Sequence, residues 1–115
     1  MPSFEFRGRR FDNPADLALQ LAGGKWKMPI LWRLKDRPWR YAELKRGLGR
    51  VTHKMLAQQL REMERDQLLT RTVYPDVPPR VEYRITDLGR EVLPAIGALR
   101  TLGERLRRAL GRPGH

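Results

Sequence analysis

"TVYPDVPPRVEYRIT", residues 72 to 86, contains two half-apolar runs that flank a connection from Pro75 to Arg80. The full runs, residues 68–74 and 81–86, are rich in β-branched and aromatic residues, and the second alternates apolar with charged side chains. This pattern predicts an antiparallel hairpin. The connection holds three of the chain's nine prolines, ends in an arginine, and exceeds the usual turn of roughly two to five residues. The stretch therefore predicts a stiff, positively charged loop at the end of a hairpin.

The segment before the hairpin predicts a helix over residues 52–66, with Thr52 as its N-cap. Three apolar residues fall on one side of it: Leu56, Leu60 and Met63. Four basic or amide residues fall on the other side: Lys54, Gln58, Arg61 and Arg65. That polar side suits DNA recognition, but the solvated face of an ordinary amphipathic helix has the same pattern. Glu62 and Glu64 favour the second interpretation, because carboxylates repel phosphate.

Shorter elements precede this helix. The sequence predicts an arm or short edge strand over residues 1–12, a helix from Asn13 to the Gly23-Gly24 pair, a second helix over 25–36, a one-pair strand at 39–41, and a short third helix over 41–48. In the second helix, an apolar stripe is formed by Trp26, Ile30 and Leu34. A short helix joined by a Gly-containing turn to another helix is typical of the helix-turn-helix.

Residues 87–110 predict a long last helix with a heptad seam. Its apolar residues are spaced alternately four and three apart: Leu88, Val92, Ala95, Leu99, Leu102, Leu106 and Ala109. One chain of 115 residues cannot cover both faces of so long an apolar helix, so we expect a homodimer. Its predicted interface comprises Leu17, Leu21, Leu99, Leu102 and Leu106. Pro94 predicts a bend or a restart of the helix, and residues 111–115 are expected to be disordered.

Composition limits the classes of function. The chain has 24 basic and 13 acidic residues, a net charge of +11 and a sequence pI near 11.2. Such an excess suits nucleic acid first and an acidic membrane surface second, although a merely soluble basic protein has the same balance. No apolar run approaches the roughly 20 residues that span a bilayer, and residues 1–11 lack the apolar core of a secretory signal. We therefore expect a cytoplasmic protein with no membrane partner.

Catalytic and metal-binding patterns are missing from the sequence. There is no cysteine, which excludes disulfides, thiolate zinc sites and thiol nucleophiles. The two histidines, His53 and His115, lie far apart, and "LAGGKW" at 21–26 lacks the spacing of a phosphate-binding loop. The sequence predicts neither an enzyme nor a cofactor.

Taken together, these elements predict a mainly α protein with a small β hairpin (α+β). Its single domain, residues 13–110, is a winged helix-turn-helix with N- and C-terminal dimerisation helices. In this fold the helix 52–66 enters the major groove of double-stranded DNA, and the wing 75–80 lies on the flanking groove. Basic side chains suit guanine edges and phosphates, and glutamine suits adenine. Pro78 and Pro79 would hold the wing extended and present Arg80 to a minor groove; alternatively, they only protect a sheet edge from pairing.

Specific motifs also resemble a known family. "GGKWKMPIL" at 23–31, "RYAEL" at 40–44 and the stretch from Lys54 to Pro94 are similar to the HxlR-type, MarR-like winged-helix transcription regulators. The resemblance implies a homodimeric bacterial repressor or dual regulator at an imperfect palindrome. It places DNA contacts on the helix 52–66 and on the wing: Thr52, His53, Lys54, Gln58, Arg61, Arg65, Pro79 and Arg80.

Two positions depart from the family pattern. Many members carry a cysteine before the first helix, where this chain has Asn13, so redox sensing is in doubt. The usual Asp-Gly after the fourth helix is replaced by Asp66-Gln67, which predicts a left-handed Gln67. Any switch must then use a reversible ligand or partner exchange. A small-molecule pocket is expected near Trp26 and Trp32, unless these side chains are plain core. A protein-interaction module and a non-specific nucleic-acid binder remain alternative functions.

Overall fold

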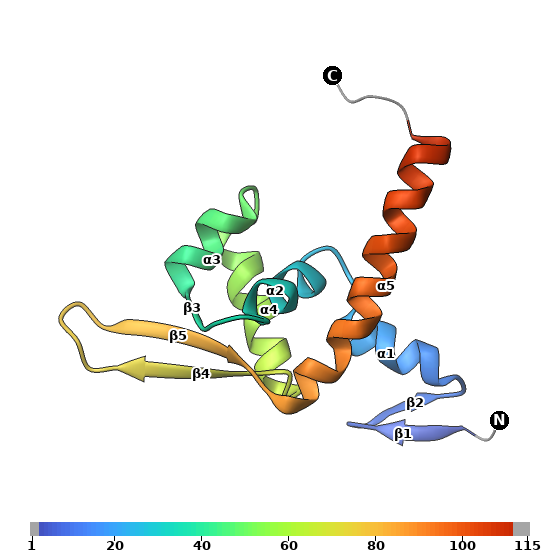
Figure 1. Ribbon diagram of the computed structural model, residues 1–115. Coiled ribbons are helices and arrows are strands. Elements are labelled where there is room, and N and C mark those ends of the chain that lie inside the picture. Colours follow the sequence, from blue (N-terminus) through green and yellow to red (C-terminus); the bar gives the residue numbers. More distant parts are fainter. Residues whose placement is uncertain (1–2, 112–115) are drawn as a thin grey trace.

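The computed structural model describes residues 3–111, so residues 112–115 of the predicted tail lie outside the described residues. The order of elements is β1 (Phe4–Phe6), β2 (Arg9–Phe11), α1 (Pro14–Ala22), α2 (Lys27–Leu34), β3 (Trp39–Arg40), α3 (Tyr41–Leu48), α4 (His53–Arg65), β4 (Leu69–Tyr74), β5 (Arg80–Ile85) and α5 (Asp87–Leu110). This arrangement confirms the predicted winged helix-turn-helix of α+β class (Figure 1). The second helix is shorter than predicted at both ends.

The wing is a three-stranded antiparallel sheet in the order β3-β5-β4. Arg80 pairs with Tyr74, so the connection runs over residues 75–79 and is one residue shorter than predicted. Arg80 therefore belongs to strand β5 and does not lie in the loop. The two-residue strand β3 pairs Trp39 with Tyr83, which attaches the start of α3 to the wing.

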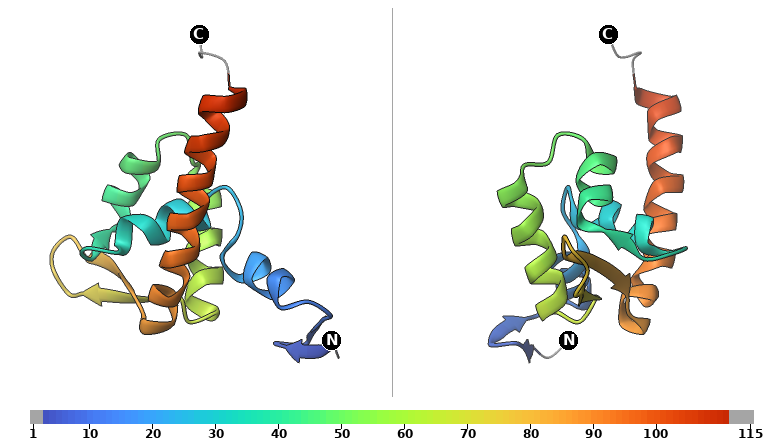
Figure 2. Two further views of the ribbon diagram at one scale, coloured as in Figure 1. Left: turned by 45° about the vertical axis from the view of Figure 1, so that its right-hand side comes forward. Right: turned by 90° about the vertical axis from the view of Figure 1, so that its left-hand side faces the viewer.

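The core lies where α2, α3 and α4 meet the sheet. Its fully buried side chains come from each of these elements: Ile30, Leu31, Leu34, Leu44, Leu56, Leu60, Met63, Leu68 and Leu69. The apolar side predicted for the fourth helix is thus its buried side. Figure 2 shows α4 beside α3, with the wing strands across the base of the domain. Burial of one side of α4 leaves its opposite side free for solvent or a ligand.

α5 leaves the domain as one continuous helix (Figures 1 and 2). Pro94 lies inside it, so the predicted restart does not occur. Pro94 has no N–H for the Arg90 carbonyl oxygen, but both residues are exposed and water can bind that oxygen. Ile96 and Gly89 are buried against the domain, and the Arg90 guanidinium donates to the Lys35 carbonyl oxygen at 3.1 Å. The first half of α5 therefore packs on α2 and the sheet, while its second half extends away.

The predicted N-terminal arm is a hairpin of its own. β1 and β2 pair with each other, and residues 7 and 8 form the turn with positive φ angles of 51° and 76°. From this turn the Arg7 guanidinium donates to the Arg65 carbonyl oxygen and lies 3.6 Å from the buried carboxylate of Asp66. Arg9 on β2 donates to the Gln20 side chain of α1 at 3.0 Å. The hairpin thus joins the C-terminal end of α4 to α1.

The residue after that helix end adopts the predicted left-handed conformation. Gln67 has a φ of 64°, a region that L side chains adopt at a cost. The Leu68 N–H then donates to the Met63 carbonyl oxygen at 2.9 Å, which closes the helix. This sharp reversal leads α4 directly into β4.

Candidate nucleic-acid interface

The exposed side of α4 carries the side chains that were predicted to bind DNA. Thr52 caps the helix, because its hydroxyl oxygen accepts from the Met55 N–H at 3.1 Å. All of the predicted positions on this element are exposed: Thr52, His53, Lys54, Gln58, Arg61 and Arg65. Within residues 3–111, no carboxylate forms an ion pair with Lys54 or Arg61. Two full positive charges therefore face solvent on one side of the helix.

The first turn of α4 is braced by α3. The Tyr41 hydroxyl lies 3.1 Å from His53 Nδ1 and 3.3 Å from the His53 carbonyl oxygen. The two rings also stack, with centroids 5.9 Å apart. This contact uses Nδ1 and leaves Nε2 of His53 without a protein partner within the described residues. The imidazole is therefore oriented at the helix N-terminus, where backbone N–H groups favour an anion.

Of the two acidic residues of α4, Glu62 has its negative charge balanced by a lysine. Glu62 lies 2.8 Å from the Lys27 ammonium of α2, and the hydrogen bond from Lys27 holds the pKa of Glu62 below its ordinary value. The Gln58 amide donates weakly to the same carboxylate at 3.4 Å. Glu64 is exposed and forms no ion pair within residues 3–111. Repulsion of phosphate therefore comes from Glu64 more than from Glu62.

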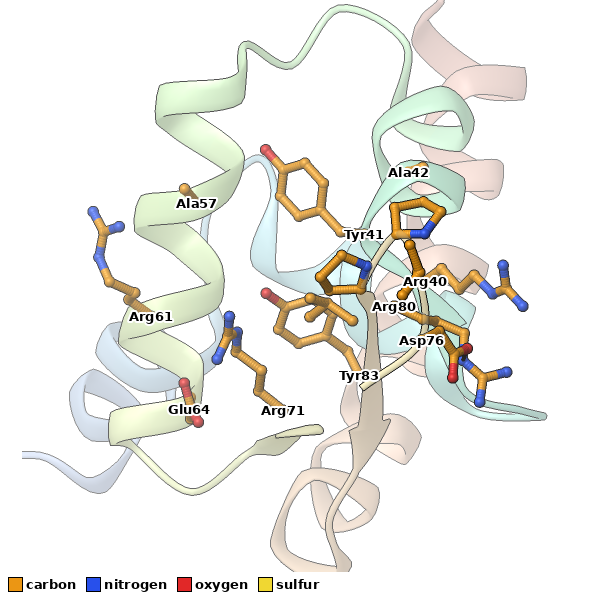
Figure 3. Close-up of a pocket in the computed structure, with 14 residues that line it drawn as sticks. Arg40, Tyr41, Ala42, Ala57, Arg61, Glu64, Arg71, Asp76, Arg80 and Tyr83 are labelled. Carbon is orange, nitrogen blue, oxygen red and sulfur yellow. Dashed lines mark ion pairs between the residues drawn. The ribbon is translucent and has the colours of Figure 1, made fainter. Parts of the chain in front are cut away.

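A groove of about 920 Å³ separates α4 from the wing. It is lined by residues of α3, α4 and the β4–β5 hairpin: Arg40, Tyr41, Ala42, Ala57, Arg61, Glu64, Arg71, Asp76, Val77, Pro78, Pro79, Arg80, Val81 and Tyr83. Figure 3 shows Arg61 and Glu64 on the α4 side, with Arg80 and Asp76 on the opposite side. Four arginines and two carboxylates line the groove, so it is basic overall.

The wing holds Arg80 in place. Its guanidinium lies 3.3 Å from Asp76 and 3.8 Å from Glu82, and it stacks 4.1 Å from the centroid of the Tyr74 ring. The loop itself exposes Val77 completely, together with Pro78 and Pro79. The tip of the wing was predicted to be positively charged, but it is apolar, and Arg80 lies at its base in an ion pair.

Two arginines of the groove were missed at the level of sequence. Arg71 lies opposite Tyr83 in the pairing of β4 with β5, and burial raises the pKa of the Tyr83 hydroxyl. Arg40 precedes α3, and its backbone N–H donates to the Glu43 carboxylate at 2.9 Å. The places of Arg40 and Arg71 in the groove depend on how the wing strands pair, and the residue pattern of 68–74 does not determine that pairing. The signal available in the sequence was that both arginines lie in or beside the strands predicted for the wing.

The predicted dimer residues lie on one exposed surface of α5 and on α1. The side chains of Leu99, Leu102 and Leu106 are about half exposed, at 49%, 49% and 47%. Leu17 and Leu21 of α1 are partly buried, whereas Leu19 on the same helix is exposed. We name the exposed row Leu88, Leu99, Leu102 and Leu106 the α5 seam. A single chain leaves it uncovered.

Comparison with protein families gives one match. The model of the HxlR-like helix-turn-helix family matches residues 21–109. A relative of 48% identity over 89 residues is the HTH-type transcriptional regulator BH0655 of Halalkalibacterium halodurans, with 76% of this chain and 79% of that protein covered. MalR of Fusobacterium mortiferum, a regulatory protein by name, is 43% identical over 85% of this chain and 93% of its own length.

A solved structure with the same fold is the redox regulator HypR in its reduced form. It superposes with a TM-score of 0.80 at 38% sequence identity, over 85% of this chain and 97% of that chain. Its name assigns redox regulation to HypR, whereas the present chain has no cysteine. Among the described residues, no helix is long and apolar enough to cross a membrane.

Proposed function

The chain belongs to the HxlR-like helix-turn-helix family of DNA-binding transcriptional regulators, and we propose that it acts as a homodimer that reads a palindromic operator. In this proposal α4 lies in the major groove of double-stranded DNA. The wing, with Pro79 and Arg80, lies on the flanking groove. Because it acts on promoter DNA, its place of action is the cytoplasm of the cell.

The exposed polar face of α4 is the observation that carries this proposal. Lys54, Gln58 and Arg61 project from one side of a helix whose other side is buried, so the backbone is held while these side chains reach outward. Arginine and lysine suit guanine or phosphate, and glutamine suits adenine. Thr52, His53 and Arg65 lie at the two ends of the face, where phosphates flank a helix in the major groove.

The α5 seam supports a dimer. Two copies that pair through this surface place their α4 helices symmetrically, so the operator repeats with the same symmetry. A dimer bound over a promoter blocks polymerase, and one bound upstream can assist it; the function is therefore that of a repressor or dual regulator. No enzymatic role or cofactor is part of the proposal.

The signal, if the regulator has one, does not use a thiol. HypR is named a redox regulator, but the first helix of the present chain begins after Asn13, whose amide caps it at 2.8 Å from the Ala15 nitrogen. An amide is neither alkylated nor oxidised to a disulfide as a thiolate is. A signal must therefore act by reversible binding of a ligand or a partner.

Selection of bound sites from genomic fragments at physiological salt tests operator reading. We expect a palindromic site, and Gln58→Ala should relax the preference at one position by about 1–3 kcal/mol per lost base contact. Gln59→Ala is the matched control, since Gln59 is the adjacent glutamine of α4 and is partly buried, whereas Gln58 is exposed. The control should keep the wild-type preference.

Other outcomes identify the alternative functions. Tight binding without sequence preference would indicate a non-specific nucleic-acid binder. Weak binding that hardly changes with salt would indicate a winged helix that contacts another protein, because phosphate contacts make DNA binding strongly dependent on salt. If alanine at Lys54, Gln58 and Arg61 together leaves operator affinity unchanged, α4 is not the reading helix.

A further inference from the structure

The turn of the N-terminal hairpin carries an arginine where the backbone disfavours one. Phe6 pairs with Arg9, so the turn consists of Arg7 and Gly8, whose φ angles are 51° and 76°. A two-residue turn with two positive φ angles normally holds asparagine, aspartate or glycine, because other L side chains adopt this region at a cost. A contact of the Arg7 side chain must offset that cost.

This contact is made with the C-terminal end of α4. The Arg7 guanidinium donates to the carbonyl oxygen of Arg65, the last residue of the helix, and lies 3.6 Å from Oδ1 of Asp66. The last carbonyl oxygens of a helix have no partner within it, and a cation is favoured there. The right view of Figure 2 shows the hairpin below this helix end. The match to the family model begins at residue 21 and does not include Arg7.

Asp66 requires a nearby positive charge. Its side chain is only 1% exposed, and its Oδ1 accepts no hydrogen bond within residues 3–111. A buried carboxylate is costly unless a cation balances it. Two guanidinium groups are close enough to do so, since Nε of Arg7 and Nε of Arg65 each lie 3.6 Å from Oδ1. The Arg7 side chain is 30% exposed and that of Arg65 is 62% exposed, so Arg7 is the more enclosed partner.

We propose that Arg7 is a positioning residue for DNA reading: it balances the charge of Asp66 and thereby frees Arg65 to contact a phosphate. Without Arg7, Arg65 is the remaining one of the two guanidinium groups, and the buried carboxylate holds it away from DNA. The Arg7 guanidinium also fixes the last turn of α4 through the Arg65 carbonyl oxygen. This inference rests on the proposed function, in which Arg65 lies at one end of the DNA-binding face.

The rest of the hairpin is anchored independently of Arg7. Arg9 donates to the Gln20 side chain of α1 at 3.0 Å. Phe11 is buried, and its ring stacks on that of Phe4 across the strand pair, with centroids 5.8 Å apart. A substitution at Arg7 therefore tests the contact with α4 and leaves the anchor of the hairpin in place.

The Arg7→Asn substitution separates the turn from this contact. Asparagine suits the left-handed position better than arginine does, but it is too short to reach α4. In the free protein, we expect amide hydrogen exchange at the end of α4, at the N–H groups of Asp66 and Leu68, to be at least about threefold faster. Arg10→Asn removes the same charge from an exposed position of the same hairpin, and it should exchange there as the wild type does.

Operator binding, measured by fluorescence anisotropy over a series of salt concentrations, tests the consequence for DNA. Arg7→Asn should bind about tenfold more weakly, with a salt dependence flattened by close to one phosphate per chain. Asp66→Asn, added to Arg7→Asn, removes the carboxylate that holds Arg65, so affinity and salt dependence should return toward those of the wild type. Arg10→Asn alone should bind as the wild type does.

Three results would overturn the proposal. One is wild-type affinity and salt dependence in Arg7→Asn. Another is an equal loss in Arg10→Asn, which would mean that the hairpin contributes charge alone. The third is a failure of Asp66→Asn to restore binding while circular dichroism shows a folded protein, since Arg65 would then not be released through Asp66. A wild type that selects no operator defeats the proposed function itself, and the exchange measurement, which needs no DNA, then decides whether Arg7 holds the end of α4.

Discussion

At the scale of single residues, the positive charges of this surface are not equivalent. Lys54 and Arg61 face solvent and have no carboxylate partner in the described part of the chain, whereas Arg80 is held by Asp76 at 3.3 Å and by the Tyr74 ring. A paired arginine attracts a phosphate less, because the adjacent carboxylate repels the same phosphate. The pair is partly exposed, and exposed ion pairs contribute little, so Arg80 can leave Asp76 at small cost.

The Asp76→Asn substitution should therefore strengthen operator binding. It removes one negative charge from the wing and leaves Arg80 with the more distant Glu82, at 3.8 Å, as its carboxylate partner within residues 3–111. The salt dependence of binding should steepen by close to one phosphate per chain if Arg80 then contacts a phosphate. Arg80→Ala should weaken binding and flatten that dependence. Fluorescence anisotropy over a series of salt concentrations measures both. Asp36→Asn, a change of equal charge outside the groove, is the control. Weaker binding by Asp76→Asn would mean that the ion pair serves to shape the wing.

At the scale of elements, α4 is held from two directions. Lys27 of α2 pairs with Glu62 in its last turn, and Arg7 of the N-terminal hairpin contacts the Arg65 carbonyl oxygen and Asp66 at its end. Arg9 of the same hairpin is bonded to Gln20 of α1. The N-terminal hairpin thereby connects α4, the helix proposed to read DNA, to α1, a helix of the proposed dimer interface. This connection does not run through the hydrophobic core.

The Lys27–Glu62 pair predicts a dependence of stability on pH. The hydrogen bond from Lys27 lowers the pKa of Glu62 in the folded chain, so the folded state binds this proton less readily than the unfolded state. The resulting stabilisation is present above the ordinary value of 4.5 and is lost as the pH falls below it. Urea unfolding between neutral and acidic pH measures this loss. Glu62→Gln should show a smaller decrease than the wild type, and Glu64→Gln should resemble the wild type. Equal slopes for wild type and Glu62→Gln would contradict the assignment.

Local signals in the sequence predicted most of these elements correctly. Thr52 as an N-cap, the buried row of α4 and the left-handed Gln67 each depend on neighbours within a few residues, and each is found. The placement of Arg80 was wrong, because strand register depends on pairing with Tyr74 across the sheet. The contact between Arg7 and Asp66 joins residues far apart in the chain, so no periodicity could indicate it.

At the scale of the whole molecule, the chain is flat, with principal extents of 49 × 45 × 25 Å. α5 explains much of this shape, since its second half projects beyond the domain (Figure 1). Its inner side packs through Gly89 and Ile96, while the α5 seam stays exposed. An apolar row of this kind on a soluble surface is typical of an interface between chains.

Leu99→Asp and Leu106→Asp should each give a folded monomer. Both leucines are half exposed, so the charge is tolerated in one chain, but it would be buried without a partner between two chains. Sedimentation at micromolar concentration measures the association, and circular dichroism checks the fold. Thr101→Asp, an exposed position of α5 away from the seam, is the control and should remain dimeric. A wild type that sediments as a monomer under these conditions would defeat the prediction.

The uncovered seam of α5 also determines how the number of paired chains changes with the amount of this protein in a cell. When chains are scarce, most are single, and the number of pairs grows with the square of the number of chains. A twofold rise in synthesis then gives about a fourfold rise in the species that occupies a two-part operator. A row of four leucines would in this way convert a gradual change in gene dosage into a threshold.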